Sequence, residues 1–198
     1  MNASQKKAAR WTEILLSLDE LGFLTTGQIQ RLHNLGGRRN AIRILNEMGA
    51  YLNTFRLDET VYYLSAAGRR EIGSKRVRKR TLAVHHTLMR NEVYIHERPG
   101  IWRVETPIKW PGNEIIPDAL YRKDRFVFLE IDRMQSMSAN AKKIDKYRQL
   151  RETGLFQKKF NGEFPLIKFV TTTEYRKKKL RALLDGVKAD VLTFEELR

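Results

Sequence analysis

The sequence contains no cysteine, which excludes disulfide bonds and thiolate metal ligands and makes a reducing cytosol the expected environment. It has no apolar run of the roughly 18 residues that a membrane helix needs, no lipidation signal and no apolar segment typical of a secretory signal. Glycine-rich motifs that bind phosphates or dinucleotides are also missing. These absences argue against membrane association and nucleotide hydrolysis, and predict a cytoplasmic protein.

Basic side chains strongly outnumber acidic ones. The 198 residues include 38 Lys and Arg but only 23 Asp and Glu, which gives a formal net charge of +15. Such an excess implies a polyanionic partner, and nucleic acid is the first candidate. With 41% hydrophobic residues the chain can build folded cores. The composition therefore predicts a folded protein that binds nucleic acid, with double-stranded DNA as the expected partner and no membrane.

A basic run divides the chain. Residues 74–81 carry five positive charges and no apolar periodicity. We therefore expect an N-terminal domain over 1–73, a linker over 74–81 and a second domain over 82–198. The basic side chains of this linker either stay solvated or also lie along DNA phosphates. They are Lys75, Arg76, Arg78, Lys79 and Arg80.

The N-terminal half is predicted to be mostly helical. Apolar residues at helical spacing indicate a helix over 11–21, and Thr25 with Gln28 resembles a capping box that opens a second helix. A third helix is expected between Gly37 and Gly49, with Ile42, Leu45 and Met48 facing inward. Strands over 51–56 and 60–64 and a helix from about residue 66 complete the half.

This order of elements is that of a winged helix-turn-helix, in which the third helix enters the major groove of DNA. The outward residues of that helix are expected to be Arg38, Arg39, Asn40 and Arg43. Arginine contacts phosphates and the O6 and N7 atoms of guanine, and asparagine pairs with adenine, so these residue types suit base reading. The alternative is a solvated polar face on a winged helix that binds another protein.

The second half alternates strands with helices, which predicts a mixed α/β sheet. The expected elements are a helix over 82–96, strands over 102–109, 114–121 and 126–132, a helix over 140–152, a strand over 166–170, a helix over 174–184 and a strand over 190–193.

Carboxylates occupy the centre of this half. Asp118 follows Pro117 in one predicted strand, and the two-residue period of the next strand puts Glu130 and Asp132 on one face. Acids at the end of so apolar a strand are costly unless they are paired or bound to a cation, and carboxylate oxygens suit Mg²⁺ or Mn²⁺. We expect the three carboxylates to converge beside a divalent ion or the ammonium group of Lys143 or Lys146.

Two short motifs carry a family resemblance. Pro117-Asp118 and Glu130-Ile131-Asp132, within an αβββαβ order, resemble the PD-(D/E)XK restriction-endonuclease-like fold. With the winged-helix order and Lys143-x-x-x-Tyr147, the whole chain resembles the replication-relaxation family of bacterial plasmids and other mobile elements. The resemblance implies an α/β (α+β) chain in which a winged helix precedes an endonuclease-like domain. It also implies a DNA-binding role in replication, relaxation or mobilisation, at the nucleoid or plasmid.

The resemblance also implies site residues. Asp118 would match the first metal-binding Asp and Glu130 the second acid, whereas Asp132 stands where that motif usually has Lys. The lysine would then come from the next helix, as Lys143 or secondarily Lys146. The implied catalytic set is Asp118, Glu130, Asp132 and Lys143, and the implied Mg²⁺ or Mn²⁺ ligands are Asp118, Glu130, Asp132 and Glu92.

Three functions remain open at this point. One is a sequence-specific DNA-binding protein of a mobile element, and the second is a metal-dependent nickase that uses the same winged helix for targeting. The third is a transcriptional regulator whose C-terminal domain dimerises or binds a partner. Asp132 in place of Lys favours binding over cleavage. Besides DNA, a second copy of the chain and replication or mobilisation proteins are candidate partners.

Two further patterns have two interpretations each. The basic run 176–179 with Arg181 is either a second phosphate-contacting patch or a solvated helix face, with equal weight. Trp102, Trp110 and Tyr121 either stack on bases or pack in a core, and core packing is favoured.

Overall fold

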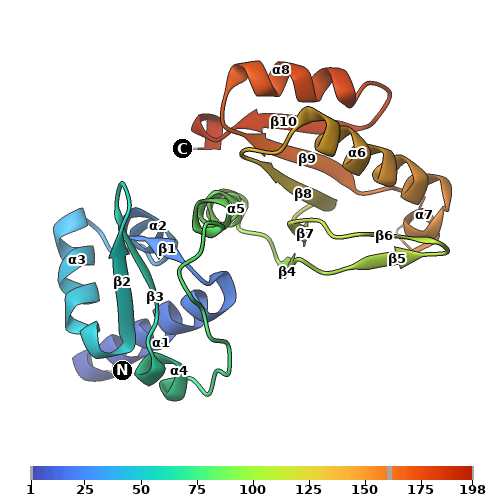
Figure 1. Cartoon of the computed structure of the whole chain (residues 1–198). Coiled ribbons are helices and arrows are strands. Elements are labelled where there is room, and N and C mark those ends of the chain that lie inside the picture. Colours follow the sequence, from blue (N-terminus) through green and yellow to red (C-terminus); the bar gives the residue numbers. More distant parts are fainter. Residues whose placement is uncertain (1, 160–161, 198) are drawn as a thin grey trace. The chain divides into compact units, whose positions relative to one another are not determined.

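The computed structural model describes residues 2–159 and 162–197 and divides the chain into two compact units, Met1–Ile95 and His96–Arg198 (Figure 1). Both units combine helices with strands, which confirms the predicted mixed α/β class. Among the helices in these residues, none is long and apolar enough to span a membrane.

The first unit is mainly helical, with a small antiparallel sheet. Its elements are α1 (Ala3–Leu21), β1 (Leu24–Thr25), α2 (Thr26–Leu32), α3 (Arg38–Glu47), β2 (Leu52–Arg56), β3 (Thr60–Leu64), α4 (Ala66–Glu71) and most of α5 (Val84–Glu97). The three strands pair in the order β1-β3-β2, and Thr54 of β2 lies opposite Tyr62 of β3. A short 3-10 turn over Gly49–Tyr51 joins α3 to β2.

Local hydrogen bonds explain where these helices begin. The predicted capping box of α2 is present: Gln28 N donates to Thr25 Oγ1 and Thr25 N to Gln28 Oε1, each at 3.1 Å. The inward face of α3 differs in part from the expectation. Ile42 is 38% exposed, and Ala41 takes the inward position instead, together with the expected Leu45.

Helix α5 belongs mostly to the first unit, because its side chains pack and hydrogen bond there. Val84 and Leu88 join a buried cluster with Phe23. Asn91 Nδ2 donates to the carbonyl oxygens of Leu21 at 2.9 Å and Phe23 at 2.8 Å. Contacts therefore divide the chain between residues 95 and 96, whereas the sequence placed the division at 74–81.

The second unit is built on a five-stranded mixed sheet. Its elements are β4 (Ile101–Val104), β5 (Ile108–Trp110), β6 (Asn113–Ile115), β7 (Ala119–Arg122), β8 (Phe126–Asp132), α6 (Met137–Glu152), α7 (Leu155–Lys159), β9 (Leu166–Thr171), α8 (Glu174–Leu183) and β10 (Ala189–Thr193). The strand order is β10-β9-β8-β7-β4, with β8, β9 and β10 parallel and the remaining pairs antiparallel. Strands β5 and β6 form a separate hairpin.

Two strands predicted as continuous are each broken in two. β4 ends before Pro107 and β6 ends before Pro117, and a new strand begins just after each proline. Proline has no backbone N–H to donate to a strand ladder, which is why a strand seldom continues through it. Glu105 adds a positive φ of 47° at the first break.

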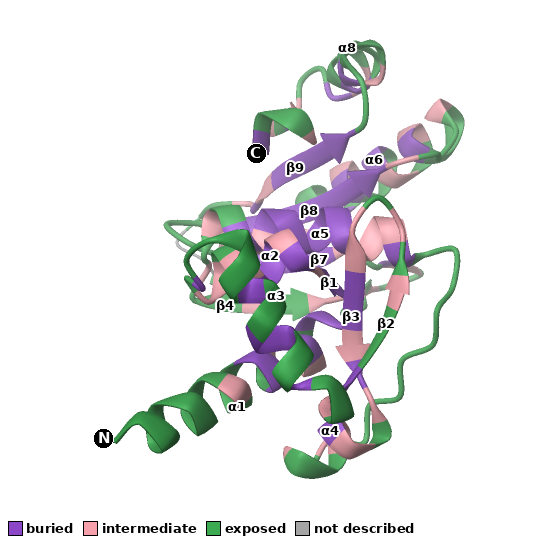
Figure 2. Ribbon diagram, turned by 90° about the vertical axis from the view of Figure 1, so that its left-hand side faces the viewer, coloured by how far each residue is buried: buried purple, intermediate pink, exposed green. Residues whose placement is uncertain are grey.

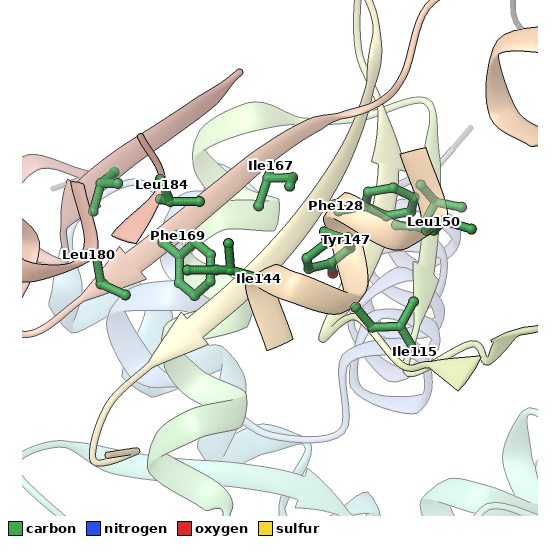
Figure 3. Close-up of a cluster of buried hydrophobic side chains, with 11 residues drawn as sticks. Ile115, Phe128, Ile144, Tyr147, Leu150, Ile167, Phe169, Leu180 and Leu184 are labelled. Atoms are coloured by element: carbon green, nitrogen blue, oxygen red, sulfur yellow. The ribbon is translucent and has the colours of Figure 1, made fainter. Parts of the chain in front are cut away.

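Helices α6 and α8 pack on one face of the five-stranded sheet, as Figure 3 shows for the buried core. The cluster contains Ile115, Leu120, Phe128, Ile144, Tyr147, Leu150, Ile167, Phe169, Leu180, Leu184 and Val191. Ser136 Oγ accepts the backbone N–H of Ala139, so α6 begins three residues earlier than expected. This packing places α6 directly over the acidic end of β8.

Candidate nucleic-acid interface and acidic site

The four residues expected on the outward face of α3, Arg38, Arg39, Asn40 and Arg43, are all exposed. Figure 2 shows that much of α3 is exposed. Some of their polar groups are already occupied within the unit. Arg38 Nη1 lies 3.5 Å from Glu59 Oε1, and Asn40 Nδ2 donates to the carbonyl of Leu35 at 2.8 Å. Asn40 therefore ties the start of α3 to the preceding turn, so its amide donor is not free to read a base.

The same face carries two residues that the sequence analysis missed. Ile42 and Asn46 are exposed and follow Arg39 by three and seven positions, so with Arg43 they form one stripe along α3. We call Arg39, Ile42, Arg43 and Asn46 the α3 stripe. Arg43 donates to Asn40 Oδ1 at 2.8 Å and to Glu47, whereas Arg39 and Asn46 have no side-chain partner within the described residues. Assigning Ala41 to the core would have revealed the stripe from the sequence.

The N-terminus of α3 is open. Its N-cap is Gly37, which provides no side-chain cap, and a Cβ added at Gly36 or Gly37 would lie more than 4 Å from any described non-neighbouring atom. The first backbone N–H groups of a helix lack intrahelical acceptors and carry the positive end of the helix dipole. This end of α3 is thus suited to an anionic group such as a phosphate.

The basic segment 75–80 runs along the first unit as an extended strap without helix or strand. Its even-numbered arginines face the unit. Arg76 Nη1 lies 3.6 Å from Asp19 Oδ2, and Arg78 lies against Gly22, where an added Cβ would be 3.3 Å from Arg78 Nε. The guanidinium carbon of Arg80 is 4.9 Å from the centre of the Phe55 ring. The three arginines thus fasten the strap to the unit.

The odd-numbered residues of the strap have no such contacts within the described residues. Lys75 and Lys79 are exposed, as is Val77 at 62%, and neither lysine has an ion pair among the described residues. Of the five linker residues predicted to contact DNA, two lysines are free to do so and three arginines already have a structural role. Contact of any of the five with DNA stays a prediction.

The acidic site of the second unit lies between β8 and α6. Glu130 is 3% exposed and accepts hydrogen bonds from Lys143 Nζ and from the hydroxyl of Tyr147. Both donors come from the same face of α6, since they are four residues apart. Burial raises the pKa of Glu130 to about 8, an effect that Lys143 opposes and the nearby charge of Asp118 reinforces. The expected ammonium group beside this acid is therefore supplied by Lys143.

Asp132 lies on the same face of β8 but has a different set of partners. Arg176 of α8 binds it through Nε at 2.8 Å and Nη2 at 2.6 Å. Asn140 Nδ2 and Thr171 Oγ1 each donate to it at 2.8 Å. Burial opposes ionisation, yet these donors outweigh it and hold the pKa of Asp132 below its ordinary value. One carboxylate thus joins β8, β9, α6 and α8.

Asp118 stands between β6 and β7, after the buried Pro117. Its backbone N–H donates to the carbonyl of Leu129 at 3.0 Å, and its Oδ2 accepts the backbone N–H of Ile131 at 2.6 Å. The side chain is half-buried. Burial is the main cause of the raised pKa values of Glu130 and Tyr147, and the charge of Asp118 adds to it. Asp118, Glu130 and Lys143 are therefore neighbours.

The three carboxylates are not arranged as the expected metal site within the described residues. Across residues 2–159 and 162–197 no group of three His, Asp or Glu side chains is placed to hold a metal ion. Asp132 has its own set of hydrogen-bond donors, Arg176, Asn140 and Thr171. Glu92, the further ligand implied by the resemblance, accepts hydrogen bonds in the first unit from Gln28 at 3.0 Å and from Arg31. Metal binding and catalysis by any of these residues stay predictions.

The fold and these sites define a strongly basic mixed α/β protein of two units, with an arginine-bearing exposed helix and buried, paired carboxylates. A family model described as replication-relaxation matches residues 15–167, which is most of the chain. The chain therefore belongs to the replication-relaxation family, as the resemblance indicated. This membership supports a role in replication or relaxation of plasmids or other mobile elements. Neither a search of curated proteins nor one of solved structures found a significant match.

Proposed function

We propose that this protein binds double-stranded DNA of a plasmid or other mobile element and reads its sequence with α3. The observation that carries the proposal is the α3 stripe, whose Arg39 and Asn46 extend from the surface with their donors unused within the described residues. The order α1, α2, α3 and then the β2–β3 hairpin agrees with that of a winged helix, whose third helix enters the major groove, and this agreement supports the proposal.

The stripe has the chemistry that base reading needs. Arg39 and Arg43 can donate to O6 and N7 of guanine, and Asn46 can pair with the N6 and N7 atoms of adenine. Ile42 offers an apolar contact of the kind that distinguishes the methyl group of thymine. These side chains recur every three to four residues, so they would meet successive base edges of one groove.

Phosphate contacts would come from other groups of the first unit. The open N-terminus of α3 offers backbone N–H donors, and Lys75 and Lys79 of the strap offer unpaired ammonium groups within the described residues. Such contacts fix the register of a protein on the duplex without reading sequence. They also make binding sensitive to salt, because each neutralised phosphate releases counterions.

The test begins with selection of bound duplexes from a randomised pool, followed by binding isotherms on the selected site and a scrambled duplex. We expect Arg39→Ala or Asn46→Ala to cost about 1–3 kcal/mol on the selected site and much less on the scrambled one. The double variant Lys75→Ala/Lys79→Ala is expected to weaken both duplexes alike. Arg10→Ala, an exposed position on α1, is the control. A pool without any preferred sequence, or equal losses on both duplexes for the stripe variants, would refute base reading.

A second candidate function is metal-dependent nicking. The observation that favours it is that Asp118, Glu130 and Lys143 lie together. The residues present do not complete a metal site, since no third acidic or histidine ligand joins the two carboxylates within the described residues. The carboxyl of Glu130 would also have to lose its proton and exchange Lys143 for the cation. Sequence-specific DNA binding is therefore the better supported function, and metal-dependent nicking is the second candidate.

A plasmid assay separates the two candidates. Supercoiled plasmid is incubated with Mg²⁺ or Mn²⁺ and with the wild type, Asp118→Ala or Lys143→Ala. We expect no relaxation in any sample and no heat of Mn²⁺ binding in calorimetric titration. Relaxation by the wild type that both variants lose would establish nicking and reverse this ranking.

A further inference from the structure

The basic run of α8 is divided by the structure into two sets of side chains. Arg176 and Lys177 face inward: Arg176 binds Asp132, and Lys177 is 5% exposed and donates to Glu196. Lys178, Lys179 and Arg181 are exposed and have no acidic partner in the part of the chain that the structure describes. The inward pair stabilises the unit, whereas the outward three remain available to an anion.

An aromatic ring stands beside the outward cations. Tyr175 is 67% exposed, and Lys179 Nζ lies 4.5 Å from the centre of its ring. Residues 175, 178 and 179 share one stripe of the helix, with Arg181 next to it. We call Tyr175, Lys178, Lys179 and Arg181 the α8 face. So large a ring, exposed among cations that have no acidic partner in the described residues, buries little surface within the unit.

We propose that the α8 face binds single-stranded DNA. The proposal deepens the proposed function, on which it rests for the nature of the nucleic acid, and adds a second contact surface in the second unit. Cations alone would suit any polyanion. The exposed tyrosine favours a single strand, because unpaired bases can stack on an aromatic side chain whereas the bases of a duplex already stack on each other.

The dimensions agree with this assignment. Residues 175 to 181 span about 9 Å along the helix at a rise of 1.5 Å per residue. A DNA strand carries one charge per roughly 3.4 Å in duplex geometry, so the whole α8 face, with its ring and its three cations, is as long as about three nucleotide steps. The ring of Tyr175 lies at one end of this face, where a flanking base can reach it.

The experiment uses the full chain and two labelled probes: a thymidine oligomer of about 20 nucleotides, longer than one such contact surface, and a mixed-sequence duplex of similar length. Affinities are measured by fluorescence anisotropy over a range of salt concentrations. The triple variant Lys178→Ala/Lys179→Ala/Arg181→Ala is compared with a control of equal charge loss, Arg103→Ala/Lys109→Ala/Lys188→Ala, at exposed positions outside α8.

For the single strand we expect the triple α8 variant to reduce the slope of log affinity against log salt by about 2, or roughly 0.7 for each lost phosphate contact. The control variant should leave this slope unchanged. Tyr175→Ala is expected to weaken single-strand binding about tenfold, and Tyr175→Phe to keep it, because stacking needs the ring and not the hydroxyl. Neither tyrosine variant should change duplex affinity.

An unchanged slope in the α8 variant, or an equal change in the control, would overturn the proposal. Equal losses on duplex and single strand would overturn it too, since the face would then hold duplex phosphates. If the α3 variants lose no sequence-specific duplex affinity while the α8 variants lose single-strand binding as expected, the proposed duplex reading is refuted and this inference stands. If the α3 variants lose that affinity and the α8 variants keep full single-strand binding, this inference alone is refuted.

Discussion

The pairing of Arg176 with Asp132 gives a test of how the second unit is held together. The side chain of Asp132 is 0% exposed and that of Arg176 is 23% exposed. Removing one partner of a buried ion pair costs about 3–5 kcal/mol, because the other charge is left uncompensated. Water can partly replace the exposed portion of the guanidinium, so we expect Arg176→Ala to lower the free energy of unfolding by about 2–4 kcal/mol.

Substitution of the other partner, Asp132, should lower the free energy of unfolding by less. Asp132→Asn leaves no buried charge, and the partly exposed guanidinium of Arg176 can turn to solvent, so about 1–2 kcal/mol is expected. The carboxylate of Asp132 has a lowered folded-state pKa and thus stabilises the fold above the ordinary Asp pKa near 4. That contribution is lost as the pH falls. The difference between wild type and Arg176→Ala should therefore shrink below about pH 4.

Tryptophan fluorescence can isolate this unit. Trp102 and Trp110 lie in the second unit and Trp11 in the first, so urea unfolding in a Trp11→Phe background reports on the second unit alone. Lys178→Ala, on the exposed side of the same helix, serves as the control and should change stability by less than about 0.5 kcal/mol. A loss below about 1 kcal/mol for Arg176→Ala, or a smaller loss than for Asp132→Asn, would contradict the reasoning.

Three further predictions concern other contacts. Burial raises the pKa of Glu130 to about 8, so the second unit should lose stability as the pH rises from about 5 to 8, and Glu130→Gln should flatten this dependence in urea titrations. At Gly68 an added Cβ would lie 2.2 Å from a backbone carbonyl oxygen, so Gly68→Ala should destabilise the first unit by about 2 kcal/mol or more in thermal melts. Gly49→Ala is the control, because a Cβ added there meets nothing within 4 Å in the described structure. Asp19→Ala should release Arg76 and speed tryptic cleavage within the strap, as mass spectrometry of timed digests would show; unchanged cleavage would mean that this ion pair does not hold the strap.

Features governed by local geometry could be predicted from the sequence. The capping box of Thr25 and Gln28 depends on residues three apart, and it is present. The two-residue period of a strand put Glu130 and Asp132 on one face, and both contact α6 as a result. Lys143 reaches Glu130 because α6 follows β8 directly and packs on that face.

Features that depend on distant partners could not be predicted. Asp132 binds Arg176, which is 44 residues away, and nothing local in the sequence indicates this partner. The buried bonds of Asn91 to residues near 21 and 23 likewise assign α5 to the first unit. The breaks in two of the strands, however, could have been predicted, because Pro107 and Pro117 mark both of them in the sequence.

The alternating strap has a consequence for how this chain tolerates change in length. Arg76 and Arg78 contact the unit at Asp19 and Gly22, and Arg80 contacts it at Phe55. Deleting or inserting a residue between Arg76 and Arg78 would move at least one guanidinium group away from its contact. The contacts on the unit therefore fix the spacing of the arginines, and with it the length of this part of the strap.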